Sequence, residues 1–290
     1  MASDLPIGIF DSGVGGLTVY RALHERLPNE RFVYLGDTAR VPYGTKSLST
    51  VERYAIENSL FLASRGIKML VVACNTASAL ALPAIRSAVG IDVVGVIGPG
   101  GRKAVDITRD LPKPKIAVIA TEATVASNAY VDAIRRASES AEVMQAACPL
   151  FVPLAEENWA FETETRSIAA KYLSGIIDFA PDALVLGCTH YPILREVISD
   201  TVGADVKLID SGEATADEVA DLLHSKGSAN SAVLPRERSL CDDLDHFYVT
   251  DAADRFARVA ERFLGVKPQV LEAIEVYGRD AIEIGAADAA

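Results

Sequence analysis

The chain has 290 residues, half of them hydrophobic, and its formal net charge of −12 at pH 7 argues against direct nucleic-acid binding, which requires clustered lysine and arginine. This length suits two domains of ordinary size, and no apolar stretch reaches the roughly 20 residues that cross a bilayer, so no membrane partner is expected. The first residues lack the pattern of a secretory signal, and four cysteines without CxxC spacing favour neither a disulfide framework nor a metal site, so we expect a cytoplasmic protein.

The first half of the chain is typical of alternating strands and helices. In chain order we expect a strand at Ile7–Phe10, a helix at Leu17–Leu27, a strand at Arg31–Leu35, a turn at Val41–Gly44, a helix at Leu48–Arg65 and a strand leading into Cys74. The last strand is a continuous apolar run, which is typical of strands buried on both faces of a parallel sheet.

The second half repeats this order, which indicates two lobes built to one plan. Its expected elements are a strand at Lys115–Ala120, a helix at Ala126–Ala137, a strand at Glu142–Ala147, the Val152-Pro153 pair, a helix at Thr163–Ile177 and a strand leading into Cys188. The two Val-Pro pairs start 111 residues apart, and Cys74 and Cys188 lie 114 residues apart. We therefore predict an α/β fold of two pseudo-symmetric lobes, each a mostly parallel sheet flanked by helices, with the active site between them.

The remaining segments predict where each lobe begins and ends. Gly95–Arg102 contains Gly-Pro-Gly-Gly and is expected to form a joint after the first lobe, and the second lobe is expected to close near Asp210. A helix, a polar loop, a strand and a helix then follow, at Ala214–His224, Ser225–Asp245, Phe247–Thr250 and Ala252–Leu264. This tail has no counterpart in the second lobe, so we expect it to complete the first. The predicted domains are residues 1–98 with 211–290, and residues 99–210, with the last ten residues frayed.

Cys74 and Cys188 stand in closely matching contexts. Each follows an apolar strand and opens a short polar turn. The carboxyl ends of parallel strands form the crevice in which open α/β sheets bind ligands. Two thiols in such positions indicate a site with one thiol on each of two opposing sides. Two buried core cysteines are the alternative.

Several motifs resemble those of glutamate racemases, from about Ile7 to about Gly265. The matching strings are Asp11–Leu17, Leu35–Asp37, Val41–Gly44, Ala73–Ala77, Cys148–Glu157 and Gly187–Pro192. The resemblance implies an isomerase that interconverts L- and D-glutamate without a cofactor and supplies D-glutamate for peptidoglycan. The alternatives are aspartate racemase, whose second motif usually resembles Cys-Thr-Glu rather than Cys188-Thr189-His190, or another member of the superfamily, such as hydantoin racemase or maleate isomerase.

Paired thiols suit this reaction. Racemisation removes a weakly acidic Cα proton from one face and returns a proton to the other, so it needs a base and an acid on opposite sides. A thiol titrates near ~8.5 when unperturbed, so one thiolate and one thiol can coexist near neutral pH. By resemblance, Cys74 deprotonates D-glutamate and Cys188 deprotonates L-glutamate.

Three further side chains are expected to assist the thiols. By resemblance, Asp11 assists the first cysteine, His190 assists the second, and Glu156 is the acidic partner in the second lobe. A carboxylate beside a thiolate raises the pKa of the thiol, so Asp11 alternatively accepts a proton or holds the substrate ammonium, and it also suits a helix N-cap. His190 is alternatively a structural histidine, and Glu157 is the alternative to Glu156.

Neutral donors at strand ends and turns suit a substrate with two carboxylates and one ammonium. The expected substrate contacts are Asp11, Ser12, Pro42, Tyr43, Gly44, Asn75, Thr76, Thr121, Thr124, Thr189 and His190. Thr121 and Thr124 are equally explained as turn or cap residues. Asp37 resembles an acid of the family that affects the rate, and a turn-forming role explains it as well. The glycines that follow Asp11 allow a close backbone approach to a ligand.

Besides the substrate glutamate, the resemblance implies a homodimer. A hypothesis from a different class is a regulatory protein that inhibits DNA gyrase, because some glutamate racemases do so. In this sequence only the acidity favours it. A supercoiling assay with a Cys74→Ala protein separates that role from racemisation.

Overall fold

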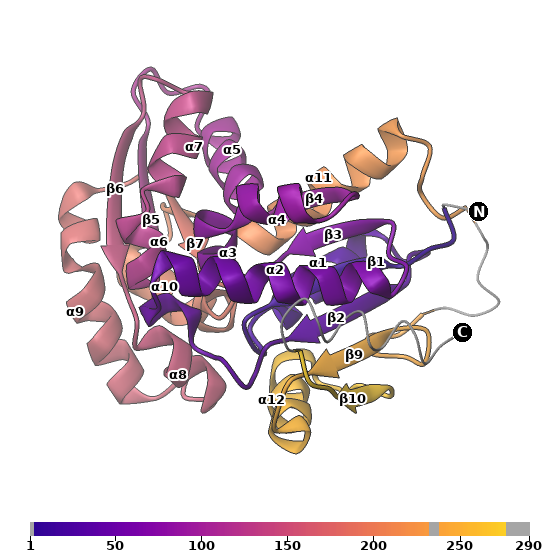
Figure 1. Ribbon diagram of the computed structural model, residues 1–290. Coiled ribbons are helices and arrows are strands. Elements are labelled where there is room, and N and C mark those ends of the chain that lie inside the picture. Colours follow the sequence, from indigo (N-terminus) through magenta and orange to yellow (C-terminus); the bar gives the residue numbers. More distant parts are fainter. Residues whose placement is uncertain (1–2, 232–237, 277–290) are drawn as a thin grey trace, which may run out of the picture.

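Two parallel β-sheets form the frame of the computed structural model, which describes residues 3–231 and 238–276 (Figure 1). Neighbouring strands run parallel throughout both sheets, and helices flank both, so the α/β class expected from the sequence is confirmed. The expected fraying of residues 281–290 lies outside the described residues. Of the helices in the described ranges, none is long and apolar enough to span a membrane.

The first sheet has six strands in the order β10-β9-β2-β1-β3-β4. Their bounds are β1 (Ile7–Asp11), β2 (Phe32–Gly36), β3 (Met69–Val72), β4 (Asp92–Gly95), β9 (His246–Val249) and β10 (Leu271–Ala273). In the centre, Ile7 of β1 is level with both Phe32 of β2 and Met69 of β3. These three strands are buried along their whole length, which explains why their sequences are continuously apolar instead of alternating.

The second sheet has four strands in the order β6-β5-β7-β8. Their bounds are β5 (Lys115–Ala120), β6 (Glu142–Ala147), β7 (Ala183–Gly187) and β8 (Lys207–Asp210). Ala120 of β5 is in register with Gly187 of β7. The next residues along the chain, Thr121 and Cys188, therefore leave the sheet at the same edge.

The helices cover the faces of both sheets (Figure 1). Their bounds are α1 (Leu17–Arg26), α2 (Leu48–Ser64), α3 (Asn75–Leu80), α4 (Leu82–Ala88), α5 (Ile97–Ile107), α6 (Glu122–Ala126), α7 (Ala129–Ala137), α8 (Phe151–Glu156), α9 (Thr163–Phe179), α10 (Arg195–Val202), α11 (Ser211–Ser225) and α12 (Ala253–Leu264), with short 3-10 turns η1 (Tyr43–Thr45) and η2 (Tyr191–Leu194). One hydrophobic core includes residues of both sheets, so the lobes share a packed interior.

The chain after α11 returns to the first sheet, as expected for the tail. β9 pairs with β2, and β10 lies outside it. Between them, α12 lies against α1, where Arg21 donates a hydrogen bond of 3.2 Å to the carbonyl oxygen of Phe263. The domain boundaries at residues 98 and 210 stay a prediction.

The joint expected at Gly95–Arg102 is not an irregular segment, because Ile97–Ile107 forms α5. Pro99 lies in the first helical turn, where the missing N–H would have no intrahelical partner. The following glycines allow close packing, since a Cβ on Gly100 would lie 3.3 Å from Tyr130 and one on Gly101 would lie 3.0 Å from the Cβ of Ala133. These glycines thus let α5 approach α7 and do not interrupt the helix.

Two other local expectations are also wrong. Glu156 does not follow Val152-Pro153 on a loop, because both belong to α8, with Pro153 in the first turn. The single helix expected at Ala126–Ala137 is divided into α6 and α7 at Asn128, which has a left-handed φ of 55°. Asparagine tolerates that conformation better than most residues.

Candidate active site

The two cysteines lie at the carboxyl edges of the two sheets. Cys74 follows β3 and caps α3, with its Sγ accepting a hydrogen bond of 3.5 Å from the backbone N–H of Ala77. Cys188 follows β7 directly. Both side chains are buried, with 5% and 6% of their surface exposed. Cys188 is among the groups whose charge raises the pKa of the Cys74 thiol, so the two cysteines lie near each other although they follow strands of different sheets.

The surroundings of Cys74 favour the protonated thiol. Its Sγ lies 3.4 Å from the hydroxyl of Ser12, and Asp11 at the end of β1 is fully buried nearby. Burial, together with the negative charge of Asp11, raises the pKa of the Cys74 thiol to about 12, although the hydrogen bonds with Ser12 and Ala77 oppose this shift. At neutral pH Cys74 is therefore an acid.

Asp11 is held on one oxygen and open on the other. Its Oδ2 accepts a hydrogen bond of 2.9 Å from the N–H of Gly13, which closes a local turn before α1. The N-cap of α1 is Gly16, so the alternative that Asp11 is a helix N-cap is wrong. Its Oδ1 has no hydrogen-bond partner within the described part of the chain. Burial raises the pKa of Asp11 above its ordinary value, although the charge of His190 opposes the shift. The free oxygen is thus a stronger base than an exposed carboxylate.

Cys188 has a cationic partner instead. Nδ1 of His190 lies 3.8 Å from Sγ of Cys188, and Nε2 lies 3.1 Å from Oε1 of Glu156. Burial alone would lower the pKa of His190, but its contacts with Cys188 and Glu156 raise it to about 10. At neutral pH His190 is therefore an imidazolium, with Nδ1 facing Cys188 and Nε2 facing Glu156.

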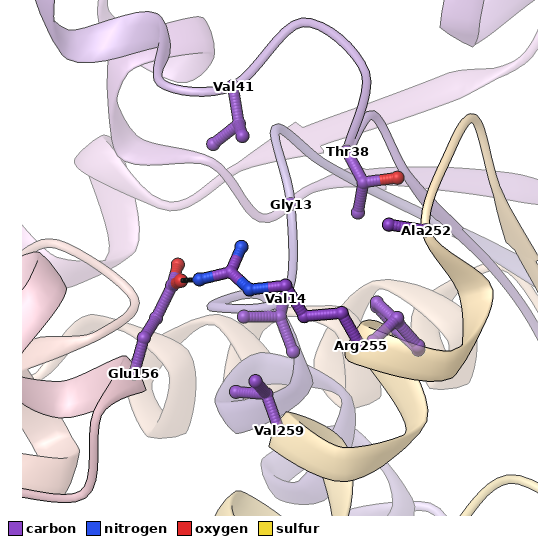
Figure 2. Close-up of a pocket in the computed structure, with 9 residues that line it drawn as sticks. Gly13, Val14, Thr38, Val41, Glu156, Ala252, Arg255 and Val259 are labelled. Atoms are coloured by element: carbon purple, nitrogen blue, oxygen red, sulfur yellow. Dashed lines mark hydrogen bonds and ion pairs between the residues drawn. The ribbon is translucent and has the colours of Figure 1, made fainter.

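Glu156 completes this row of groups. Burial would raise the pKa of its carboxyl group, but the hydrogen bonds and charges of His190 and Arg255 lower it overall. Its Oε2 accepts a hydrogen bond of 2.9 Å from the Arg255 guanidinium (Figure 2). Glu156, the preferred candidate from the sequence, reaches His190, whereas no interaction joins Glu157 to it.

Three threonines from the two lobes meet beside the thiols. The hydroxyl of Thr76 lies 3.0 Å from that of Thr121 and 3.3 Å from that of Thr124, and the last two are 3.0 Å apart. Gly44 lies against this group, since a Cβ there would be 2.9 Å from the Cβ of Thr121. The expected donors from separate segments are thus brought together.

Asn75 and Thr189 lie at the beginnings of the segments that follow the two strands. The Oδ1 of Asn75 accepts a hydrogen bond of 2.7 Å from Tyr130, while its buried Nδ2 has no partner among residues 3–231 and 238–276. The carbonyl oxygen of Thr189 accepts a hydrogen bond of 2.8 Å from Thr18 of α1, which ties the second lobe to the first. The amide of Asn75 keeps a donor for a ligand.

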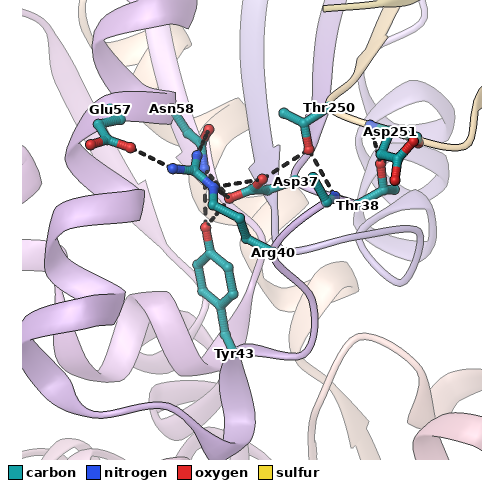
Figure 3. A network of polar contacts seen from close by, with 9 residues as sticks. Asp37, Thr38, Arg40, Tyr43, Glu57, Asn58, Thr250 and Asp251 are labelled. Atoms are coloured by element: carbon teal, nitrogen blue, oxygen red, sulfur yellow. Dashed lines mark hydrogen bonds and ion pairs between the residues drawn. The ribbon is translucent and has the colours of Figure 1, made fainter. Parts of the chain in front are cut away.

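The hydroxyl of Tyr43 is bound within the protein. It donates to Asp37, which is also held by Arg40, by Asn58 at 2.9 Å and by Thr250 at 2.9 Å (Figure 3). This buried network supports the turn that contains exposed Pro42. Because the Tyr43 hydroxyl already donates to Asp37, only backbone groups at Tyr43 and Gly44 are left in this turn to contact a substrate.

A cavity lies at the seam beside this site. It is lined by Gly13, Val14, Thr38, Val41, Glu156, Ala252, Arg255, Phe256 and Val259 (Figure 2). Neither cysteine lines it. In the described ranges, no three His, Cys, Asp or Glu side chains are grouped to hold a metal ion.

Sequence reasoning missed the contribution of α12. Arg255 and Arg262 contact the side chain and the backbone of Glu156, and Phe263 lies edge-on to the His190 ring with centroids 6.0 Å apart. The sequence of α12 is charged and amphipathic, like that of any helix with one face in solvent. No local signal could have assigned these residues to the site.

Comparison with known proteins defines the class first. The sequence profile of the Asp/Glu/hydantoin racemase family matches residues 7–219, and the chain belongs to this family.

The relatives then define the group within the family. The chain is 51% identical to the glutamate racemase of Geobacter metallireducens over 261 residues, 90% of this chain and 93% of that protein. It is similar to the crystal structure of glutamate racemase isoform RacE1 from Bacillus anthracis, with a TM-score of 0.87 and 36% identity over 94% of this chain and 98% of that one. The structure of glutamate racemase from Francisella tularensis in complex with D-glutamate has a TM-score of 0.84 and 38% identity, with the same coverage of both chains. The chain is an amino-acid racemase of the glutamate racemase group, as its motifs predicted.

Proposed function

We propose that this protein interconverts L-glutamate and D-glutamate by moving protons between the substrate Cα and two thiols, those of Cys74 and Cys188. One observation carries the proposal. The thiols come from opposite lobes and have unlike partners, a buried carboxylate for Cys74 and an imidazolium for Cys188. One cysteine is thereby suited to donate a proton while the other accepts one.

In the direction from L- to D-glutamate, the Cys188 thiolate takes the Cα proton. The C–H bond breaks, its electron pair stays on the substrate as a carbanion, and an S–H bond forms. The Cys74 thiol then gives its proton to the opposite face of Cα. In the reverse direction the roles exchange, so Cys74 acts as the thiolate and Cys188 as the thiol. The imidazolium of His190 stabilises the Cys188 thiolate, and Glu156 holds that imidazolium in place.

When the reverse direction starts from the Cys74 thiol and the Cys188 thiolate, Cys74 must lose a proton and Cys188 must gain one. We assign the acceptor role to Asp11 and the donor role to the imidazolium of His190, which contacts Cys188. The Oδ1 of Asp11 is free of hydrogen bonds in the described ranges, and burial raises the pKa of Asp11, both of which favour uptake of a proton. The alternative role for this oxygen, in its ionised form, is to hold the substrate ammonium.

The substrate carboxylates are assigned to neutral donors. The hydroxyls of Ser12, Thr76, Thr121, Thr124 and Thr189, the amide of Asn75, and the backbone at Tyr43 and Gly44 supply such donors, with Pro42 shaping the turn. Such neutral donors bind a carboxylate through hydrogen bonds to the anion.

We further propose that the protein acts as a homodimer in the cytoplasm, where its thiols stay reduced, and that its D-glutamate serves peptidoglycan synthesis. Sedimentation equilibrium tests the dimer. The regulatory alternative, inhibition of DNA gyrase, is tested with Cys74→Ala, which removes the thiol and leaves the outer surface unchanged.

Circular dichroism of purified protein with L-glutamate, D-glutamate or L-aspartate, without added cofactor, tests the activity. We expect both glutamate enantiomers to decay to zero ellipticity and L-aspartate to stay unchanged. Decay of L-aspartate alone would identify an aspartate racemase. An unchanged signal with all three substrates would refute the proposed function.

A further inference from the structure

Helix α12 contacts the Cys188 side of the site at three points, although it belongs to the first lobe. Arg255 donates to Oε2 of Glu156 at 2.9 Å, Arg262 donates to the backbone oxygen of Glu156 at 2.7 Å, and Phe263 lies edge-on to the ring of His190. Figure 2 shows the Arg255 side chain extending from α12 toward Glu156. Glu156 ends α8 in the second lobe, so these contacts cross between the lobes.

We propose that Arg255 is a positioning residue for the racemase reaction, because it holds Glu156 across the lobes so that Glu156 fixes His190 against Cys188. This inference rests on the proposed function, since it assigns Cys188 a proton-transfer role. Arg255 itself does not contact the reacting atoms.

The geometry of a carboxylate supports this role. Glu156 has two oxygens, and each has a different partner, with Oε2 on Arg255 and Oε1 on Nε2 of His190. A guanidinium bound to one oxygen restricts rotation of the carboxylate plane. The other oxygen then points at His190, whose opposite nitrogen faces Cys188. Without Arg255, the carboxylate can turn toward solvent and release the imidazole.

The pattern of burial separates this role from a contribution to stability. The Arg255 side chain is 54% exposed, whereas that of Glu156 is 13% exposed. An ion pair with one exposed partner contributes little to folding. Solvent does not weaken the effect of Arg255 on the orientation of Glu156 in this way, because Glu156 and His190 are shielded from water.

The test compares Arg255→Gln and Arg255→Lys with Arg258→Gln, a matched control on the exposed side of the same helix. We expect R255Q to lower kcat about tenfold or more, as small misplacements of catalytic groups do. The primary deuterium isotope effect should rise more with L-glutamate than with D-glutamate, because only the Cys188 step is affected. R255K should recover part of the loss, and R258Q should match the wild type.

A second readout does not depend on racemase activity. Iodoacetamide modifies thiolates, and mass spectrometry can follow modification of Cys188 and Cys74 separately. In R255Q, modification of Cys188 at pH 7 should slow several-fold relative to R258Q, with Cys74 unchanged. Inactive wild-type protein would refute the proposed function but leave this measurement valid. The positioning role would be overturned if R255Q kept the isotope effects of the wild type and its rate of Cys188 modification. It would also be overturned if the loss of activity in R255Q were explained by a lowered Tm alone.

Discussion

The most direct test of the contact between the lobes is Gly15→Ala. Gly15 lies in the loop after β1, and a Cβ there would lie 2.4 Å from Cε1 and 2.5 Å from Nδ1 of His190, and 2.4 Å from Oγ1 of Thr189. The second lobe therefore occupies the space that a side chain at Gly15 would need. Gly15 is the point at which the first lobe packs directly against the Cys188 partner.

The size of the effect follows from these distances. Real Cβ atoms essentially never come closer than 3.0 Å to another heavy atom, so His190 must move by at least about 0.6 Å, and by ~1 Å for an ordinary contact in a close-packed interior. The clash includes Nδ1, the atom that faces Cys188. A misplacement of ~1 Å typically lowers rates about 100-fold, which corresponds to roughly 3 kcal/mol in the activation barrier.

We expect Gly15→Ala to lower kcat for both enantiomers by about 100-fold, measured by circular dichroism. Gly90→Ala is the matched control, because a Cβ at Gly90 meets no atom within 4 Å. Thermal unfolding of both variants shows whether the chain still folds. A folded G15A protein with the kcat of G90A would refute the reasoning, since it would mean that His190 can move without consequence.

Other predictions concern the thiols, metals and pH. Cys74→Ser and Cys188→Ser should each abolish racemisation, because a hydroxyl is far too weak an acid to replace a thiol. Each variant should still eliminate HCl from one enantiomer of chloroglutamate. If both variants eliminated HCl from the same enantiomer, the two thiols could not lie on opposite sides of the substrate. Dialysis against EDTA and removal of pyridoxal phosphate should leave kcat unchanged; a loss restored by metal would show that the acid–base description is incomplete. The pKa of His190 is raised from 6.5 to about 10 in the folded protein, so the stability from its protonation is fully present below pH 6.5 and is lost as pH rises through about 10. The Tm of the wild type should therefore exceed that of His190→Asn most at low pH, and a gap that widens toward pH 10 would contradict the assigned charge.

The parts of the fold that could be predicted are those with strong local signals. Continuous apolar runs predict β3 and β7, and the motifs that follow these two strands identify Cys74 and Cys188 as candidate site residues. Short elements such as α3 and α4 were missed, because Asn75–Ala88 is rich in small residues and carries a proline in the first turn of α4. The glycine-rich start of α5 predicts a joint, because glycine has a low helix propensity. Packing against α7 outweighs that low propensity, and a helix forms.

The site could be predicted only as far as its motifs reached. His190 lies two residues after Cys188, so their pairing has a local signal. Arg255 lies 99 residues from Glu156, and nothing in its own segment distinguishes it from Arg258. Such contacts depend on how the lobes meet, which is a property of the whole fold and not of any short pattern.

The surroundings of the two thiols differ, but the equilibrium between the enantiomers limits how this difference can appear in the kinetics. Cys74 lies beside a buried carboxylate, which raises the pKa of its thiol, whereas Cys188 lies beside the imidazolium of His190. In the proposed mechanism, the two directions of the reaction therefore start from different protonation states of the thiols. Because the substrates are enantiomers, their equilibrium constant is one, and kcat/KM must be equal in the two directions. In steady-state kinetics the asymmetry can thus appear only as a matched difference in kcat and KM, whereas isotope effects report the two proton-transfer steps separately.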